Sequence, residues 1–284
     1  MKWATVQVAG QSRAGLIEGQ EVCVIDAPDL APVLGDLPAA ARRAATGDRL
    51  RLDQVEILQP ILRPRKILGI GLNYAAHAKE SVSFAKSTPA TVQKWFNKQA
   101  SAANGPYAPV HLPAVSEQLD YEAELVAVIG KTGRHVPEDR ALELVAGFCC
   151  GCDFSVRDWQ RASQTMIMGK GFDTHAPFGP YLVTPDEISD FGGLEIRGYV
   201  NGELRQKGVA RDMIFNLAQQ ISHLTAAFTL EPGDLIFTGT PAGVGAGFDP
   251  PKWLKAGDRV RVEISGLGHL ETPIVEEKKI TVLK

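Results

Sequence analysis

The sequence predicts a mixed α/β fold dominated by β structure, with a β-roll or barrel that follows a small N-terminal β-meander domain. From Lys66 onward the chain consists of many short β-like segments separated by Gly and Pro. Only two helices stand out in this part of the chain. Because the strands do not alternate with helices long enough to connect parallel strands, a doubly wound parallel sheet is disfavoured.

The N-terminal part has the pattern of a small antiparallel meander. Residues 3–26 alternate short apolar runs (WATVQV, AGLIEG, EVCVID) with Gly and Asp turn signals. A short Ala- and Leu-rich helix near residues 38–46 and a strand near VEILQPIL complete this part. Pro64 biases the residue before it away from helix. We therefore expect a small α/β domain at residues 1–62 and a larger catalytic domain at residues 63–284.

The larger domain is expected to contain seven strands and two helices. One helix begins near Asn73, and the other covers residues 213–228, where apolar residues recur at helical spacing. The expected strands are KILGIGL, AELVAVIG, PYLVT, LEIRGYVNGEL, DLIFTG, RVRVEI and TPIVEE.

The bulk properties narrow the classes of function. A chain of 284 residues with 44% hydrophobic and 22% charged residues can bury one sizeable core. A net charge of -3 offers no basic surface for nucleic acid, and no apolar run is long enough to span a membrane. MKWATVQVAG has no signal-peptide pattern, so a cytoplasmic location is expected. Cys149, Cys150, Cys152 and the distant Cys23 fit buried thiols better than a zinc site or disulfides.

A pair of carboxylates on a predicted strand suggests a metal site. Glu122 and Glu124 are two residues apart, so both side chains project from one face of the strand. Taken alone, such a pair is more often a solvated strand face. Asp153, however, lies in an otherwise apolar stretch, and Asp is rarely buried without a partner. Three carboxylates suit Mg²⁺ or Mn²⁺, with Ca²⁺ as an alternative, whereas zinc prefers His or Cys.

The chain also resembles a known family through seven motifs in a fixed order. They are GLNYAAHAKE (71–80), FNKQASAANGPY (96–107), YEAELVAVIGK (121–131), DFSVRDWQ (153–160), GKGFDTHAPFGPY (169–181), VNGELRQ (200–206) and PGDLIFTGTPAGVG (232–245). Together they resemble the fumarylacetoacetate hydrolase family, in its acylpyruvate or diketo-acid hydrolase branch, from about residue 65 to residue 275. The resemblance implies that family's β-roll for the catalytic domain.

The resemblance implies a metal site at Glu122, Glu124 and Asp153, the residues that the strand argument selects. It also implies a catalytic pair at His77 and Glu80. An HxxE spacing alone is a weak signal, but residues three apart on a helical turn share a face. A carboxylate that accepts from one ring nitrogen leaves the other nitrogen as a base toward water.

The remaining site residues are also implied by the resemblance. Arg157 and Gln160 match substrate-binding positions, and Lys170 matches a catalytic one; all three would direct donors at the reacting carbonyl, although surface salt bridging is the alternative outside this context. Arg157 could share a helical turn with Asp153. Thr240, in a Gly-Thr-Pro turn, would hold the substrate carboxylate. Further substrate contacts are implied for a segment that usually covers the site, at Lys98 and Ser101.

These parts lead to a hypothesis for the reaction. A 2,4-diketo acid or acylpyruvate would chelate the metal, water activated by His77 and Glu80 would attack the distant carbonyl, and a metal-bound enolate would leave. The same enolate would form in decarboxylation or isomerisation of a related keto acid such as oxaloacetate, so these remain alternatives. A non-catalytic metal-binding module is the third possibility. The resemblance further implies a homodimer and a role in aromatic or sugar catabolism.

Overall fold

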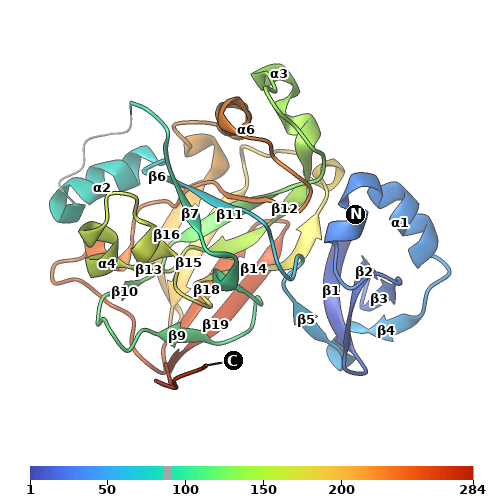
Figure 1. Cartoon of the computed structure of the whole chain (residues 1–284), viewed down its shortest axis with the longest axis horizontal. Helices are drawn as coiled ribbons and strands as arrows, with labels where there is room; N and C mark the ends of the chain where they lie inside the picture. Colours follow the sequence, from blue (N-terminus) through green and yellow to red (C-terminus); the bar gives the residue numbers. More distant parts are fainter. Residues whose placement is uncertain (86–90, 284) are drawn as a thin grey trace.

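A large open β-sheet runs through the computed structural model, which describes residues 1–85 and 91–283 (Figure 1). Its strands follow the order β4-β3-β2-β1-β14-β12-β11-β17-β6-β7, with β5 paired to β1 and β8 to β14. The strands are β1 (Lys2–Val8), β2 (Gln11–Glu18), β3 (Glu21–Val24), β4 (Arg49–Arg51), β5 (Glu56–Leu58), β6 (Ile67–Gly71), β7 (Lys94–Lys98), β8 (Ala103–Asn104), β11 (Ala123–Ile129), β12 (Val145–Cys152), β14 (Ala176–Val183) and β17 (Leu235–Phe237).

A second sheet packs against one face of the first. Its order is β16-β15-β18-β19-β9, formed by β9 (Val110–Leu112), β15 (Glu195–Val200), β16 (Glu203–Val209), β18 (Arg259–Ile264) and β19 (Gly268–Glu276). Ile196 and Val262 of this sheet belong to the same buried cluster as Leu125 and Ala127 of β11. The predicted β-roll is confirmed, while the sheets stay open and form no closed barrel in the described part of the chain.

Strand β11 is buried on both faces, which explains its uninterrupted apolar sequence. Leu125 and Ala127 face the second sheet, whereas Val126 and Val128 join a second core with Trp3 on the opposite side. A strand whose two faces are both buried shows a continuous apolar run because side chains alternate between the faces. The carboxylates near its start are therefore held at the centre of the fold, and the solvated-edge alternative is wrong.

The N-terminal meander is confirmed as β1, β2 and β3, which pair antiparallel in sequence. Helix α1 (Leu37–Ala44) lies close to its predicted place and is capped by Asp36, whose carboxylate accepts from the Ala39 N–H. β1 also pairs with β14, so one sheet continues across residue 62. The division of the chain at this residue stays a prediction.

Helix α6 (Leu217–Ala227) begins four residues later than predicted. Asn216 accepts from the Gln219 N–H, and the Gln219 side chain accepts from the Asn216 N–H, which together form a capping box. Before this cap, Ala210–Asp212 forms a single 3-10 turn. The other helices are α2 (Ala75–Ala85), α3 (Glu138–Ala141), α4 (Arg157–Ala162) and α5 (Ile167–Lys170).

The expectation that Asp153 shares a helical turn with Arg157 is wrong. β13 (Ser155–Val156) lies between them and pairs antiparallel with β10 (Leu119–Asp120), which keeps the backbone extended until α4 begins.

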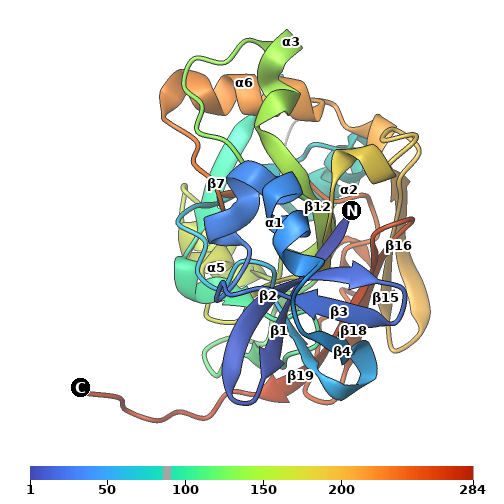
Figure 2. The same ribbon diagram turned by 90° about the vertical axis from the view of Figure 1, so that its right-hand side faces the viewer.

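The four cysteines are free and buried, as expected, and three of them lie on β12. Beyond β19 the last residues extend away from the body of the molecule, as Figure 2 shows. None of the helices in the described residues is long and apolar enough to cross a membrane.

Candidate metal and keto-acid site

Three carboxylates meet where β11 and β12 lie side by side. Glu122 comes directly before β11, Glu124 lies within it, and Asp153 follows β12. The Asp153 N–H donates to the Glu122 carbonyl at 2.9 Å, which continues the pairing of the two strands. One carboxylate oxygen from each residue lies within 4.8 Å of the others, and the residues are 6%, 1% and 0% exposed. The structure therefore brings together the three predicted metal ligands.

Buried cations balance two of these carboxylates. Lys170 Nζ donates to Glu122 at 2.8 Å and to Asp153 at 2.5 Å. Arg157 lies 2.7 Å from Glu122, and Lys98 Nζ donates to Asp153 and, at 3.0 Å, to the Phe154 carbonyl. A buried charge is tolerated when it is paired and hydrogen-bonded.

Glu124 is the carboxylate with the weakest compensation. It accepts a hydrogen bond from the Gly239 N–H at 2.8 Å. Burial, together with the negative charges of Asp153 and Glu122, raises the pKa of Glu124 well above the usual range. For Glu122, by contrast, burial raises the pKa, but Lys170 and Arg157 outweigh it and lower the pKa. A divalent cation among the three oxygens would keep Glu124 ionised. The all-oxygen donor set fits Mg²⁺ or Mn²⁺.

His77 and Glu80 form the predicted pair on α2. His77 Nδ1 lies 3.1 Å from Glu80 Oε2. The Gly243 N–H in turn donates to both oxygens of Glu80, at 3.0 and 3.2 Å. When Nδ1 carries the proton, Nε2 is the basic nitrogen, and the carboxylate stabilises the imidazolium that forms on protonation.

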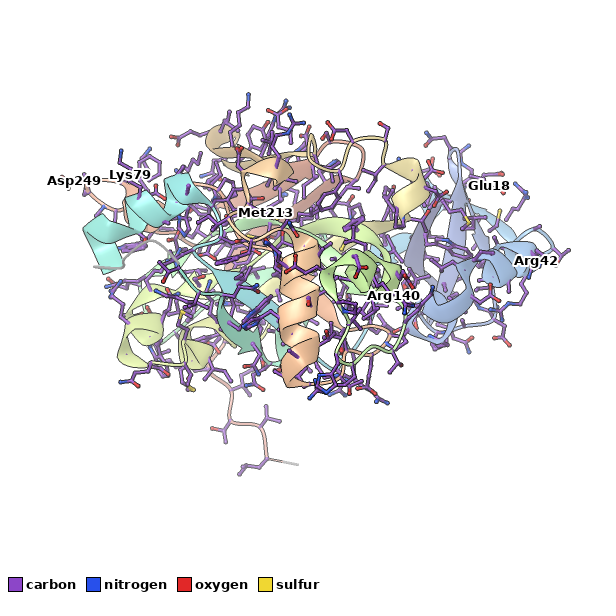
Figure 3. All side chains as sticks on the ribbon, turned by 90° about the horizontal axis from the view of Figure 1, so that it is seen from above. Glu18, Arg42, Lys79, Arg140, Met213 and Asp249 are labelled. Atoms are coloured by element: carbon purple, nitrogen blue, oxygen red, sulfur yellow. The ribbon has the colours of Figure 1, made fainter. Side chains whose placement is uncertain are left out.

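His77 and Glu122 line a cavity of about 240 Å³, whereas Glu80, Glu124 and Asp153 lie outside its lining. It opens among α2, α4, β6 and β7, on the side of the molecule remote from the N-terminal meander (Figures 1 and 3). The predicted site residues that line it are His77, Glu122, Arg157, Gln160, Lys170 and Thr240. Lys98 is buried behind it on β7, and Ser101 is exposed and does not line the cavity. The structure therefore does not bring Ser101 to the site.

Thr240 is positioned by the protein itself. Its hydroxyl donates to the Ala123 carbonyl at 2.9 Å and accepts from Gln206 Nε2 at 2.8 Å. The predicted contact of this hydroxyl with a substrate carboxylate stays a prediction. Because its one hydrogen is directed at the backbone, backbone N–H groups of the turn are the better donors.

Two buried positioning residues were not selected from the sequence. Asp120 accepts from Arg157 Nε at 2.8 Å and from the N–H groups of Gly245 and Ala246 at 2.6 and 3.0 Å. Gln206 connects the Ala123 N–H to Thr240 and the Pro241 carbonyl. The sequence did contain signals for both residues. Asp120 continues the two-residue spacing of Glu122 and Glu124, and Gln206 ends the motif VNGELRQ.

Comparisons with known proteins agree with these motifs. Residues 66–275 match the family model described as fumarylacetoacetate (FAA) hydrolase C-terminal, and residues 1–60 match the model described as Rv2993c-like, N-terminal. Human oxaloacetate tautomerase FAHD2A, mitochondrial, is 41% identical over 241 residues, which cover 84% of this chain and 76% of the relative. The Xenopus laevis oxaloacetate tautomerase fahd2 is 42% identical over 228 residues, covering 80% and 70%.

Solved structures show the same fold. The fumarylacetoacetate hydrolase from Exiguobacterium antarcticum superimposes with a TM-score of 0.84 at 35% identity, over 98% of this chain and 100% of that one. Maleylpyruvate hydrolase from Sphingobium sp. SYK-6, solved in complex with manganese(II) ion and pyruvate, superimposes with a TM-score of 0.80 at 30% identity and the same coverage.

Proposed function

Because the chain belongs to the fumarylacetoacetate hydrolase family, we propose that it binds a small 2-keto acid with Mg²⁺ and catalyses a reaction that proceeds through the enolate. The observation that carries this proposal is the composition of one cavity. Glu122, which belongs to the buried carboxylate triad that fits a divalent cation, lines it together with His77, whose ring pairs with Glu80. An enolate-forming enzyme needs both parts, a Lewis acid for the developing oxyanion and a base for the proton.

The chain's own residues would handle charge and protons. The ion, when bound, would supply Lewis-acid polarisation at Glu122, Glu124 and Asp153. His77 takes up a proton while Glu80 holds its ring through Nδ1. Arg157 and Lys170 line the same cavity and direct cationic donors toward the developing negative charge. One such donor is worth about 2.7–4 kcal/mol in the transition state.

Keto–enol isomerisation of an oxaloacetate-type acid is the reaction we place first. The two oxaloacetate tautomerases, 41–42% identical to this chain, are relatives whose names state a specific reaction, whereas two putative hydrolases from Burkholderia at the same identity name no substrate. In this reaction His77 would move a proton between the carbon beside the keto group and the enol oxygen.

Hydrolysis of the C–C bond of an acylpyruvate is the second candidate. It is favoured by the similarity to the fumarylacetoacetate and maleylpyruvate hydrolase structures. Here His77 would take its proton from water, which attacks the distant carbonyl. The enolate of pyruvate would then leave and be protonated, so both candidates use the same base and the same oxyanion donors.

A substrate panel separates the candidates. With Mg²⁺ present, isomerisation would appear as exchange of the oxaloacetate C3 hydrogens for deuterium, followed by NMR, and hydrolysis as pyruvate released from acetylpyruvate or fumarylpyruvate. We expect His77→Ala to lower the active reaction by about 10²–10⁴-fold while Mg²⁺ affinity stays nearly unchanged. Lys79→Ala, at an exposed position of the same helix, is the matched control.

Full activity in His77→Ala would remove His77 as the base. A protein that binds Mg²⁺ but converts no keto acid would instead favour the non-catalytic metal-binding module. A cytoplasmic location and a homodimer also remain proposals; sedimentation analysis tests the second.

A further inference from the structure

We propose that Lys94 and Arg161 form a binding site for a second carboxylate, at the end of the substrate remote from its 2-keto acid group. This inference rests on the proposed function and narrows its substrates to dicarboxylic keto acids. Both residues line the same cavity as His77 and Lys170, although neither belongs to the carboxylate triad or its ion pairs.

Lys94 is directed at the cavity by the alternation of β7. It pairs with Gly71 of β6 in an unbroken antiparallel register, so its side chain projects from the same face as those of Phe96 and Lys98. Phe96 lines the cavity, and Lys170 Nζ lies over its ring, 4.7 Å from the ring centroid. Lys98 reaches Asp153 behind it. Lys94, which is half-buried, therefore occupies the outer position of a row that leads to the metal ligands.

Arg161 lines the same cavity and lies on α4. It lies four residues after Arg157, so the two side chains share a helix face. Its guanidinium donates to the Gln118 amide oxygen at 2.6 Å, which orients the group without neutralising its charge. Arg161 is exposed, as expected for a residue at the mouth of the cavity.

The cations deep in the cavity, Lys170 and Arg157, have acidic partners that the cations at its mouth, Lys94 and Arg161, lack within the part of the chain that the structure describes. Lys170 and Arg157 are buried, and both pair with Glu122. Lys94 and Arg161 have no ion pair with an acidic group among the described residues. Lys170 and Arg157 are thus paired with carboxylates of the triad, whereas Lys94 and Arg161 leave positive charge without a described acidic partner at the mouth of the cavity.

A carboxylate is the ligand that best matches this outer pair. Arg and Lys bind carboxylates through charge-assisted hydrogen bonds, and Arg can bind both oxygens at once. A cavity of about 240 Å³ suits a compact acid with both ends recognised, not a long apolar acyl chain. The 2-keto acid end would lie at the triad and the second carboxylate between Lys94 and Arg161.

The test compares two ligands that differ only in the distal charge. Oxaloacetate and the methyl ester of its distal carboxylate would be titrated into the Mg²⁺-loaded protein by calorimetry, and the KM and kcat of both would be measured. We expect Lys94→Met and Arg161→Gln each to weaken oxaloacetate binding and raise its KM by about tenfold, since a hydrogen bond to a charged group is lost. The ester should bind equally to all proteins, and kcat should change little.

Matched controls remove a cation that does not line the cavity. Lys79→Met on α2 and Arg140→Gln on α3, both exposed and both labelled in Figure 3, should leave the preference for oxaloacetate over its ester unchanged. Oxalate, which carries only the chelating end, should bind to wild type and variants alike.

The outcomes separate this inference from the proposed function. If the Lys94 and Arg161 variants lose affinity for oxaloacetate and for its ester equally, or lose affinity for neither, the second-carboxylate site is overturned even when turnover is normal. A wild-type protein that converts neither ligand contradicts the proposed function. Its calorimetric preference for the diacid over the ester still decides the inference, and equal affinity for the two would overturn it.

Discussion

At the scale of single residues, the site depends on a buried carboxylate that takes no part in the triad. Asp120 is 0% exposed. Its carboxylate accepts hydrogen bonds from Arg157 Nε and from the N–H groups of Gly245 and Ala246. It thereby joins the strand that precedes Glu122 to the turn that follows β17. Arg157 is held between Asp120 and Glu122, so its position depends on both.

We expect Asp120→Asn to destabilise the fold and to impair catalysis. The amide keeps the shape but loses the charge opposite Arg157, and breaking a buried pair costs about 3–5 kcal/mol. Urea unfolding measures the first effect and kcat the second, while Mg²⁺ affinity should change only slightly. Asp53→Asn is the control, since its ion pair with Arg51 is exposed and should contribute little to stability. Equal effects of the two substitutions would contradict the positioning role.

At the scale of elements, a glycine-rich turn holds the catalytic pair. Gly243 has φ +107°, a backbone conformation that favours glycine, and its N–H donates to Glu80 on α2. A Cβ atom at this residue would lie 1.8 Å from the Arg205 carbonyl oxygen. The turn must therefore approach β16 closely in order to present its N–H to the helix.

Gly243→Ala should reduce both stability and turnover, because the turn must move away from β16 and release Glu80. Gly202→Ala is a matched control: its φ is +81°, but nothing lies within 4 Å of the added Cβ. The control should lose only about 1–2 kcal/mol from the left-handed conformation and keep its kcat. If both variants unfold and turn over alike, the contact between the turn and Glu80 does not matter for function.

At the scale of the whole molecule, the triad couples metal binding to folding. Its ligands lie in or directly beside two strands at the centre of the large sheet, so the unfolded chain does not hold them together. A ligand that binds only the folded state stabilises that state according to its concentration.

Mg²⁺ at a hundred times its Kd should therefore raise the free energy of unfolding by about 2.7 kcal/mol and the Tm by about 5–10 °C, both measured by calorimetry. Glu124→Gln should abolish this increment. Without metal the variant should be at least as stable as wild type, because it removes a carboxylate whose pKa burial and neighbouring charges raise. An equal Mg²⁺ effect in the variant would exclude Glu124 from the ligand set.

The sequence by itself determined the β-dominated class, the N-terminal meander and most of the strands, together with two local pairs. The shared strand face of Glu122 and Glu124 and the shared helix face of His77 and Glu80 follow from side-chain periods, which are local properties. The catalytic pairing of His77 with Glu80 was implied by the family resemblance. The ordered motifs added Lys170, Arg157 and the family. The comparisons confirmed the family.

Only the tertiary structure decided which distant residues meet. The pairing of β11 with β12 places Asp153 beside Glu122. The position of β7, a segment that was not expected to be a strand, brings Lys94 to the cavity and Lys98 to Asp153. It also left the roll open and placed Ser101 outside the site. The physical reason is that strand pairing joins residues far apart in sequence, so local spacing cannot specify their contacts.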